Sequence, residues 1–108
     1  MIVEMRVYHC APGRLPALNE RFSKATLGFF EKHGIRPIGF WTTLVGPSNH
    51  ALTYLLEWES LAEREQKWNA FQADPDWIAK RVESEAQQPI VERIESQFLV
   101  PTDYSALR

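Results

Sequence analysis

The chain of 108 residues has little of what marks secreted, membrane-spanning or nucleic-acid-binding proteins. Its one cysteine, Cys10, excludes an internal disulfide and a thiolate metal cluster. No apolar run reaches the roughly 18 residues of a membrane helix, and Glu4 and Arg6 interrupt the first apolar segment, which therefore does not fit a signal peptide. The net charge of −2 provides no positive surface for nucleic acid or anionic lipid. We therefore expect a cytoplasmic protein that neither binds nucleic acid nor inserts into a membrane.

Histidine and glycine are too dispersed to build a common site. His9, His33 and His50 fall in three separate predicted elements, without the spacing that brings two imidazoles onto one metal ion. His9 and Cys10 are adjacent on a predicted strand, so their side chains point to opposite faces and a thiol–imidazole pair is not expected. The glycines form no phosphate-binding loop. We predict neither a metal nor a cofactor.

What the chain does have is the composition of a single globular domain. Apolar residues make up 44% and charged residues 24%, and a chain of this length buries somewhat over half of its unfolded surface in one core. We expect one domain over 1–108, with a core over 1–100 and a C-terminal tail over 101–108.

The densest run of strand-forming residues, 35–60, predicts a β-hairpin. The turn formers Gly46-Pro47-Ser48-Asn49 separate two aromatic and β-branched segments, so about four to six residues connect the strands. Side chains alternate in direction along a strand. One face of the second strand therefore carries Leu52, Tyr54, Leu56 and Trp58.

The segment before this hairpin predicts a strand followed by a helix. Residues 2–9 alternate, which puts Glu4, Arg6 and Tyr8 on one face of the strand. From 15 to 33, apolar residues recur at steps of three and four, the pattern of an amphipathic helix of about five turns. His33 is expected to cap the end of this helix, just before Gly34.

The segment after the hairpin predicts two helices and a last strand. A capping box over 60–63 begins a helix in which Arg64 falls within the apolar stripe. We expect Arg64 to pack over the core and reach a glutamate or solvent, the alternative being an anion-binding role. Asp74-Pro75 begins a second short helix that ends near Gln87. A strand over 90–100 follows.

This order of elements is the ferredoxin-like βαββαβ pattern, an α+β fold with a four-stranded antiparallel sheet and its helices on one face. We expect the other face to be too aromatic for water and too charged for a simple core. Pairing two such sheets in a homodimer would give a dimeric α/β barrel with an enclosed cavity. The residues assigned to that face are Glu4, Arg6, Tyr8, Tyr54, Leu56, Trp58, Arg93 and Glu95.

Four short motifs, in this order and spacing, resemble the NIPSNAP family. The resemblance covers roughly 1–100 and implies a dimeric α+β barrel, an architecture also found in small monooxygenases that use neither metal nor flavin. The sequence departs from many members at Tyr54 and Leu56, where they carry His and Trp. The motifs are Gly39-Phe40-Trp41-Thr42-Thr43, Gly46-Pro47-Ser48-Asn49, Ser60-Leu61-Ala62-Glu63-Arg64 and Asp74-Pro75-Asp76-Trp77.

The candidate ligand-binding residues combine aromatic walls with a few polar groups, which suits a small apolar or aromatic molecule. Aromatic packing in a dimer interface is the alternative explanation for the same residues. Two functions follow: a homodimeric barrel that binds a small hydrophobic or aromatic molecule in its cavity, or a cofactor-independent enzyme, such as a monooxygenase or isomerase. Whether Trp41 faces the cavity depends on the strand register. The candidates are Arg6, Tyr8, Trp41, His50, Tyr54 and Trp58.

Overall fold

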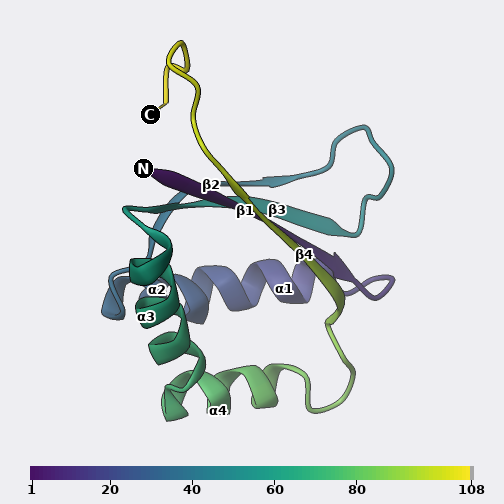
Figure 1. The fold of residues 1–108 in the computed structure, drawn as a ribbon. Helices are drawn as coiled ribbons and strands as arrows, with labels where there is room; N and C mark the ends of the chain where they lie inside the picture. The colour runs from purple at the N-terminus through teal and green to yellow at the C-terminus, as the bar shows by residue number, and fades with distance from the viewer. Residues whose placement is uncertain (108) are drawn as a thin grey trace.

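The structure is a computed structural model that describes residues 1–107, a four-stranded antiparallel sheet with helices on one side (Figure 1). The strand order β2-β3-β1-β4, with antiparallel neighbours throughout, confirms the ferredoxin-like arrangement. No helix within 1–107 is long and apolar enough to cross a membrane. The elements are β1 (Ile2–Cys10), α1 (Leu15–Arg21), the π-helical η1 (Phe22–Thr26), α2 (Leu27–Lys32), β2 (Arg36–Thr42), β3 (Ala51–Trp58), α3 (Leu61–Gln72), α4 (Pro75–Ser84) and β4 (Val91–Leu99).

The first helix runs without a break through α1, η1 and α2, as the apolar spacing predicts. Its central turn is π-helical, and the Thr26 hydroxyl donates to the Arg21 carbonyl, five residues earlier, at 3.3 Å. The helix ends at Lys32 with His33 as its capping residue, followed by Gly34 with φ of 70°, the left-handed conformation that glycine adopts without strain. The His33 imidazole lies 2.7 Å from Asp74 and so ties this end to the start of α4.

Helices α3 and α4 begin at the capping residues that the sequence predicts. The Glu63 amide donates to Ser60 Oγ at 3.1 Å, and the Asp76 amide donates to Asp74 Oδ1 at 2.9 Å. Two boundaries differ from expectation. Helix α4 ends at Ser84, earlier than predicted, and the hairpin connection 43–50 is longer than the four to six residues expected.

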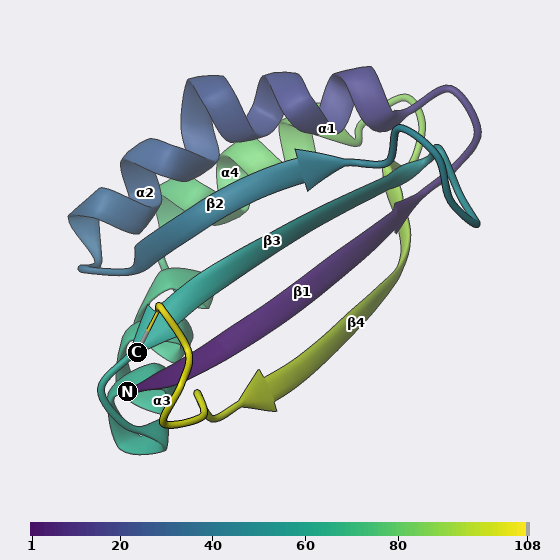
Figure 2. The ribbon, with the colours of Figure 1, turned by 90° about the horizontal axis from the view of Figure 1, so that it is seen from above.

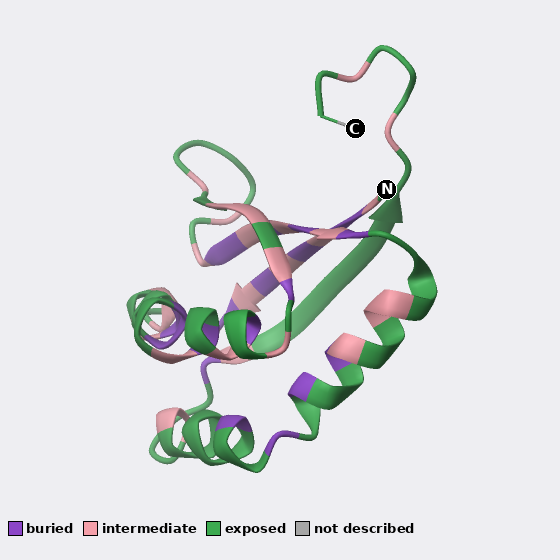
Figure 3. Cartoon of the chain, turned by 90° about the vertical axis from the view of Figure 1, so that its left-hand side faces the viewer, coloured by how far each residue is buried: buried purple, intermediate pink, exposed green. Residues whose placement is uncertain are grey.

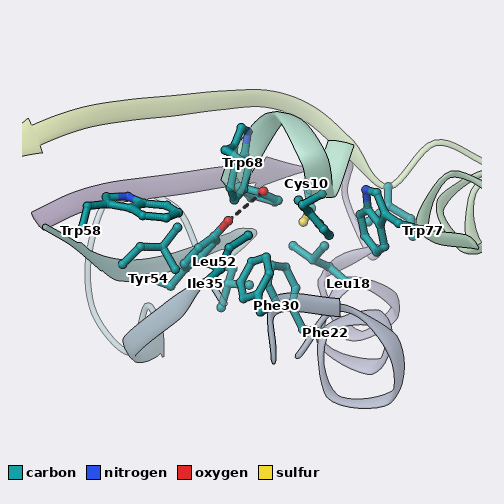
Figure 4. Packing of buried hydrophobic residues seen from close by; sticks show 14 residues of the cluster. Cys10, Leu18, Phe22, Phe30, Ile35, Leu52, Tyr54, Trp58, Trp68 and Trp77 are labelled. Atoms are coloured by element: carbon teal, nitrogen blue, oxygen red, sulfur yellow. Dashed lines mark hydrogen bonds between the residues drawn. The ribbon is translucent and has the colours of Figure 1, made fainter. Parts of the chain in front are cut away.

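Buried residues lie where the sheet and the helices face each other (Figure 3). Many of these buried residues are aromatic, and their rings pack together in the core (Figure 4). Phe22 of the first helix lies edge-on to Tyr54 of β3, with ring centroids 5.3 Å apart. Phe30 and Phe71 meet in the same way at 5.3 Å. These contacts join the first helix both to the sheet and to α3. The opposite face of the sheet, called the open face below, lies in front of the helices when the sheet is viewed from above (Figure 2).

The expected assignment of the two sheet faces is wrong for six residues. Glu4 bonds to Arg64 of α3, and Tyr8 packs edge-on against Phe22 of η1. Their face therefore meets the helices of the same chain. Charged groups tolerate that burial here because they pair with one another. Arg93 and Glu95 lie on the open face as expected. The six corrected residues are Glu4, Arg6, Tyr8, Tyr54, Leu56 and Trp58.

Candidate functional site

Four of the six candidate residues lie in one buried polar cluster between the sheet and the helices. The antiparallel register places residues of β1, β3 and β4 side by side, and Arg64 reaches them from α3. Its members, called the buried polar cluster below, are Glu4, Arg6, Tyr8, Tyr54, Trp58, Arg64 and Ser96.

Arg6 connects the tyrosines of the buried polar cluster to its carboxylate. Its Nε donates to the Tyr54 hydroxyl at 3.0 Å, and its terminal nitrogens donate to Glu4 at 3.0 Å and to the Tyr8 hydroxyl at 3.3 Å. The guanidinium also lies 4.3 Å from the ring centroid of Trp68. Burial acts to lower the pKa of Arg6, but the two tyrosines and Glu4 outweigh it and raise that pKa.

Glu4 is fully buried and accepts five hydrogen bonds. Arg64 donates twice at 3.2 Å, Trp58 Nε1 once at 3.0 Å and Ser96 Oγ once at 2.7 Å, in addition to Arg6. Burial acts to raise the pKa of Glu4, but the donors together lower it below its usual value. Glu4 is therefore an ionised carboxylate at neutral pH, neutralised by two arginines.

The chemistry of the buried polar cluster is that of a structural network. The Tyr54 hydroxyl donates to Tyr8 at 2.8 Å while it accepts from Arg6, so the polar groups pair with one another. Burial raises the pKa of Tyr54 well above its usual value, which keeps the phenol protonated and unable to act as a base. The aromatic side chains fill the space around it (Figure 4).

The other two candidate residues lie elsewhere. Trp41 pairs with Thr53 in the sheet and is on the open face, where 52% of it is exposed. Its ring lies over Gly39, where an added Cβ would stand 2.8 Å from the ring, so the glycine makes room for it. His50 ends the loop before β3, and its backbone amide donates to Ser48 Oγ at 3.1 Å. The structure therefore does not gather the six residues into one site.

The open face carries a different mixture of side chains. A shallow hollow of about 430 Å³ on it is walled by Met5, Val7, Glu95 and Gln97. His9 Nε2 lies 2.7 Å from Glu95 at the edge of this hollow, and that contact is the main cause of the lowered pKa of Glu95. The register gives this face Val3, Met5, Val7, His9, Gly39, Trp41, Ala51, Thr53, Leu55, Glu57, Arg93, Glu95, Gln97 and Leu99.

Sequence reasoning missed two of the side chains that surround Arg6 and Glu4. Ser96 and Trp68 carry no local signal, because their partners are far away in the chain. Arg64 was expected to pack over the core and reach a glutamate or solvent, and the structure confirms this, with Glu4 as the glutamate. The charged residues Glu4 and Arg6 in a strand were the one indication that a partner from a distant part of the sequence would be needed to neutralise them.

Comparisons with known proteins agree with this architecture. The family model named NIPSNAP matches residues 3–106. The chain belongs to the NIPSNAP family. A NIPSNAP domain protein from Burkholderia xenovorans is 27% identical with a TM-score of 0.84, and the match covers 97% of this chain and 98% of that one. A NIPSNAP family protein from Agrobacterium tumefaciens is 24% identical with a TM-score of 0.88, over 99% and 98% of the two chains.

A more distant likeness concerns the fold alone. A putative antibiotic biosynthesis monooxygenase from Nitrosomonas europaea superposes with a TM-score of 0.63 at 9% identity, covering 94% of this chain and 98% of that one. Curated proteins give no match. The NIPSNAP assignment therefore fixes family and fold, and the activity must be argued from the molecule itself.

Proposed function

We propose that this NIPSNAP protein is a homodimer that packs its open face against that of a second copy and holds a small hydrophobic or aromatic molecule between the two sheets. The observation that carries this proposal is the open face itself. It is apolar at the centre of the sheet, includes a hollow, and lies outside the core that the helices cover.

The apolar side chains of the open face support a second copy as its occupant. Met5, Val7 and Leu55 are only half-buried by their own chain, and Trp41 is 52% exposed beside them. A mixed apolar row of this size is typical of an interface. The face carries charges of both signs, with Arg93 against Glu57 and Glu95, so an identical surface offers opposite charges to pair with.

Exposed apolar side chains at both ends of the sheet also support a second copy on the open face. After β4, Val100 is 79% and Tyr104 89% exposed, and in the hairpin connection Leu44 and Val45 are 97% and 93% exposed. The tail curls over the sheet side rather than the helix side (Figure 2). A second copy seated on the open face would lie beside both segments and shield their apolar side chains from water.

The hollow on the open face supports the binding of a small molecule there. Its volume of about 430 Å³ exceeds the roughly 300 Å³ at which small-molecule sites begin. Its floor is formed by Met5 and Val7, while Glu95 and Gln97 provide polar groups on one side. A second sheet would close the hollow, exclude water and leave these few polar groups to orient a bound molecule.

The test measures binding of an uncharged dye, Nile red, by the wild-type protein and two variants. Met5→Lys places a charge in the centre of the open face, and we expect it to abolish dye binding and yield a monomer. Val82→Lys is the matched control, because Val82 lies on α4 and is 60% exposed. Val82→Lys should leave dye binding and the oligomeric state unchanged. Dye binding by Met5→Lys at wild-type affinity would contradict the proposal.

The alternative function is a cofactor-independent monooxygenase or isomerase that uses Arg6 and the tyrosines. The likeness to a monooxygenase concerns the fold only. In the buried polar cluster, Arg6 is 6% exposed and donates hydrogen bonds to Tyr54, Glu4 and Tyr8 of the same cluster. A substrate would have to displace that packing, so the open face is the better-supported site.

A further inference from the structure

A second cavity lies on the helix side of the molecule, away from the open face. It has a volume of about 700 Å³, opens to solvent, and lies between the first helix and α4, which run side by side below the sheet (Figure 1). Its walls include Arg14, Arg21, Lys24, Lys80 and Ile90. Two separate segments of the chain, the first helix with the residue before it and α4, therefore place basic side chains around one space.

The guanidinium of Arg21 is buried, and hydrogen bonds and opposite charge satisfy it only in part. The residue is 8% exposed, one terminal nitrogen donates to Ser84 Oγ at 3.2 Å, and its Nε has no hydrogen-bond partner. The nearest carboxylate oxygen, of Glu85, is 3.9 Å away. The other oxygen of Glu85 already accepts from the Ile90 amide at 2.7 Å. Burial is the main cause that lowers the pKa of Arg21.

Arg14 stands two helical turns before Arg21 and so projects on the same side of the helix. It donates to two backbone carbonyls, of Ser84 at 3.4 Å and Gln88 at 3.2 Å. Its Nε is also buried without a partner, and among residues 1–107 it forms no ion pair with a carboxylate. Two guanidinium groups thus share at most one distant carboxylate. Buried charges are costly unless they are paired.

The mouth of the cavity adds further positive charge. Lys24 pairs with Glu20 at 2.8 Å, and Lys80 lies 3.9 Å from Glu83, with all four side chains largely exposed. The lining therefore has four cationic residues and two carboxylates, and four minus two leaves a net charge of +2. The remaining wall combines uncharged polar residues, which include Ser84 and Gln88, with apolar ones, which include Ala17, Ala25 and Ile90. Charge and shape together fit an anionic head with a short apolar body.

We propose that this cavity binds a small organic anion, with its carboxylate or phosphate group held by Arg14 and Arg21. The planar fork of a guanidinium pairs two N–H groups with two oxygens of either anion. Lys24 and Lys80 draw the anion to the mouth, and the alanine and isoleucine side chains contact its apolar body. This site shares no residue with the open face, so a test of anion binding here does not depend on whether the protein forms the proposed dimer.

The test is an NMR titration of arginine Nε–H signals with two probes, inorganic phosphate and benzoate, at constant ionic strength set with sodium chloride. In the wild-type protein we expect the Arg14 and Arg21 signals to shift and saturate with at least one probe. The signal of Arg64, whose Nε donates to Glu4 inside the buried polar cluster, is the internal control and should not move. Saturation by phosphate only or by benzoate only assigns the head group, and each outcome supports the site.

Two variants distinguish binding at this site from nonspecific attraction of anions to the protein. Arg14→Gln should weaken binding of the active probe about tenfold to a hundredfold, since hydrogen bonds to charged groups contribute the most. Lys80→Gln, at an exposed position, should weaken it severalfold without affecting the fold, which keeps the test valid if the arginine variant is unstable. Shifts that do not saturate with either probe, or unchanged affinity in both variants, would overturn the proposal.

Discussion

Replacing the fully buried carboxylate by Glu4→Gln tests the buried polar cluster most sharply. One oxygen of Glu4 accepts from Arg6, Arg64 and Ser96, and the other accepts from Trp58 and Arg64. An amide nitrogen in either place leaves two or three donors without an acceptor and removes the charge that neutralises two arginines. Breaking a buried ion pair in this way costs about 3–5 kcal/mol, a large part of the roughly 5–15 kcal/mol that stabilises a domain.

The assay is urea unfolding at pH 7, followed by tryptophan fluorescence at one fixed protein concentration. The midpoint should fall strongly for Glu4→Gln with the slope unchanged. Glu20→Gln is the matched control, because it makes the same chemical change in an exposed pair with Lys24. It should shift the midpoint little. A loss below about 1 kcal/mol in Glu4→Gln would refute the structural role of the cluster, since even one unpaired buried donor costs that much.

Three further predictions concern single hydrogen bonds. Tyr54→Phe leaves the buried Nε of Arg6 without its acceptor and should cost about 1–3 kcal/mol in urea unfolding, a loss near zero being the contrary result. Ser60→Ala removes the acceptor for the Glu63 amide and should cost about 1 kcal/mol, which a thermal melt would detect and an unchanged melting temperature would contradict. The Glu59 amide is the main cause that lowers the pKa of Glu63 from 4.5 to about 2, so this carboxylate stabilises the fold above pH 4.5 and loses that effect as the pH falls toward 2. Glu63→Gln should therefore show a smaller stability loss than the wild type between those pH values, and identical pH curves would contradict this.

Local signals predicted most of the architecture. Alternation and helical spacing act within a few residues, so they located the strands and the first helix. The Asp74-Pro75 and Ser60-to-Glu63 signals set the helix starts because a capping side chain bonds to backbone amides in its own first turn. The length of the hairpin connection was less well predicted, since residues 43–45 extend a turn that needs only four residues.

The orientation of the sheet could not be obtained from the same signals. Alternation shows that Glu4, Arg6 and Tyr8 share one face of their strand, but not which face of the sheet the helices cover. Two charges seemed to favour the side away from the helices. They are buried instead because Arg64, sixty positions from Glu4, completes the network. Pairing over such separations depends on the fold and leaves no local pattern.

The open face remains the centre of the functional account, and its association can be measured directly. Light scattering coupled to size exclusion gives the mass of the wild-type protein in solution at micromolar concentration. One chain has a mass of 12.5 kDa, so the account predicts twice that, 25 kDa. A particle of 12.5 kDa that persists as the protein concentration is raised would contradict the pairing of open faces, and with it the enclosed ligand site.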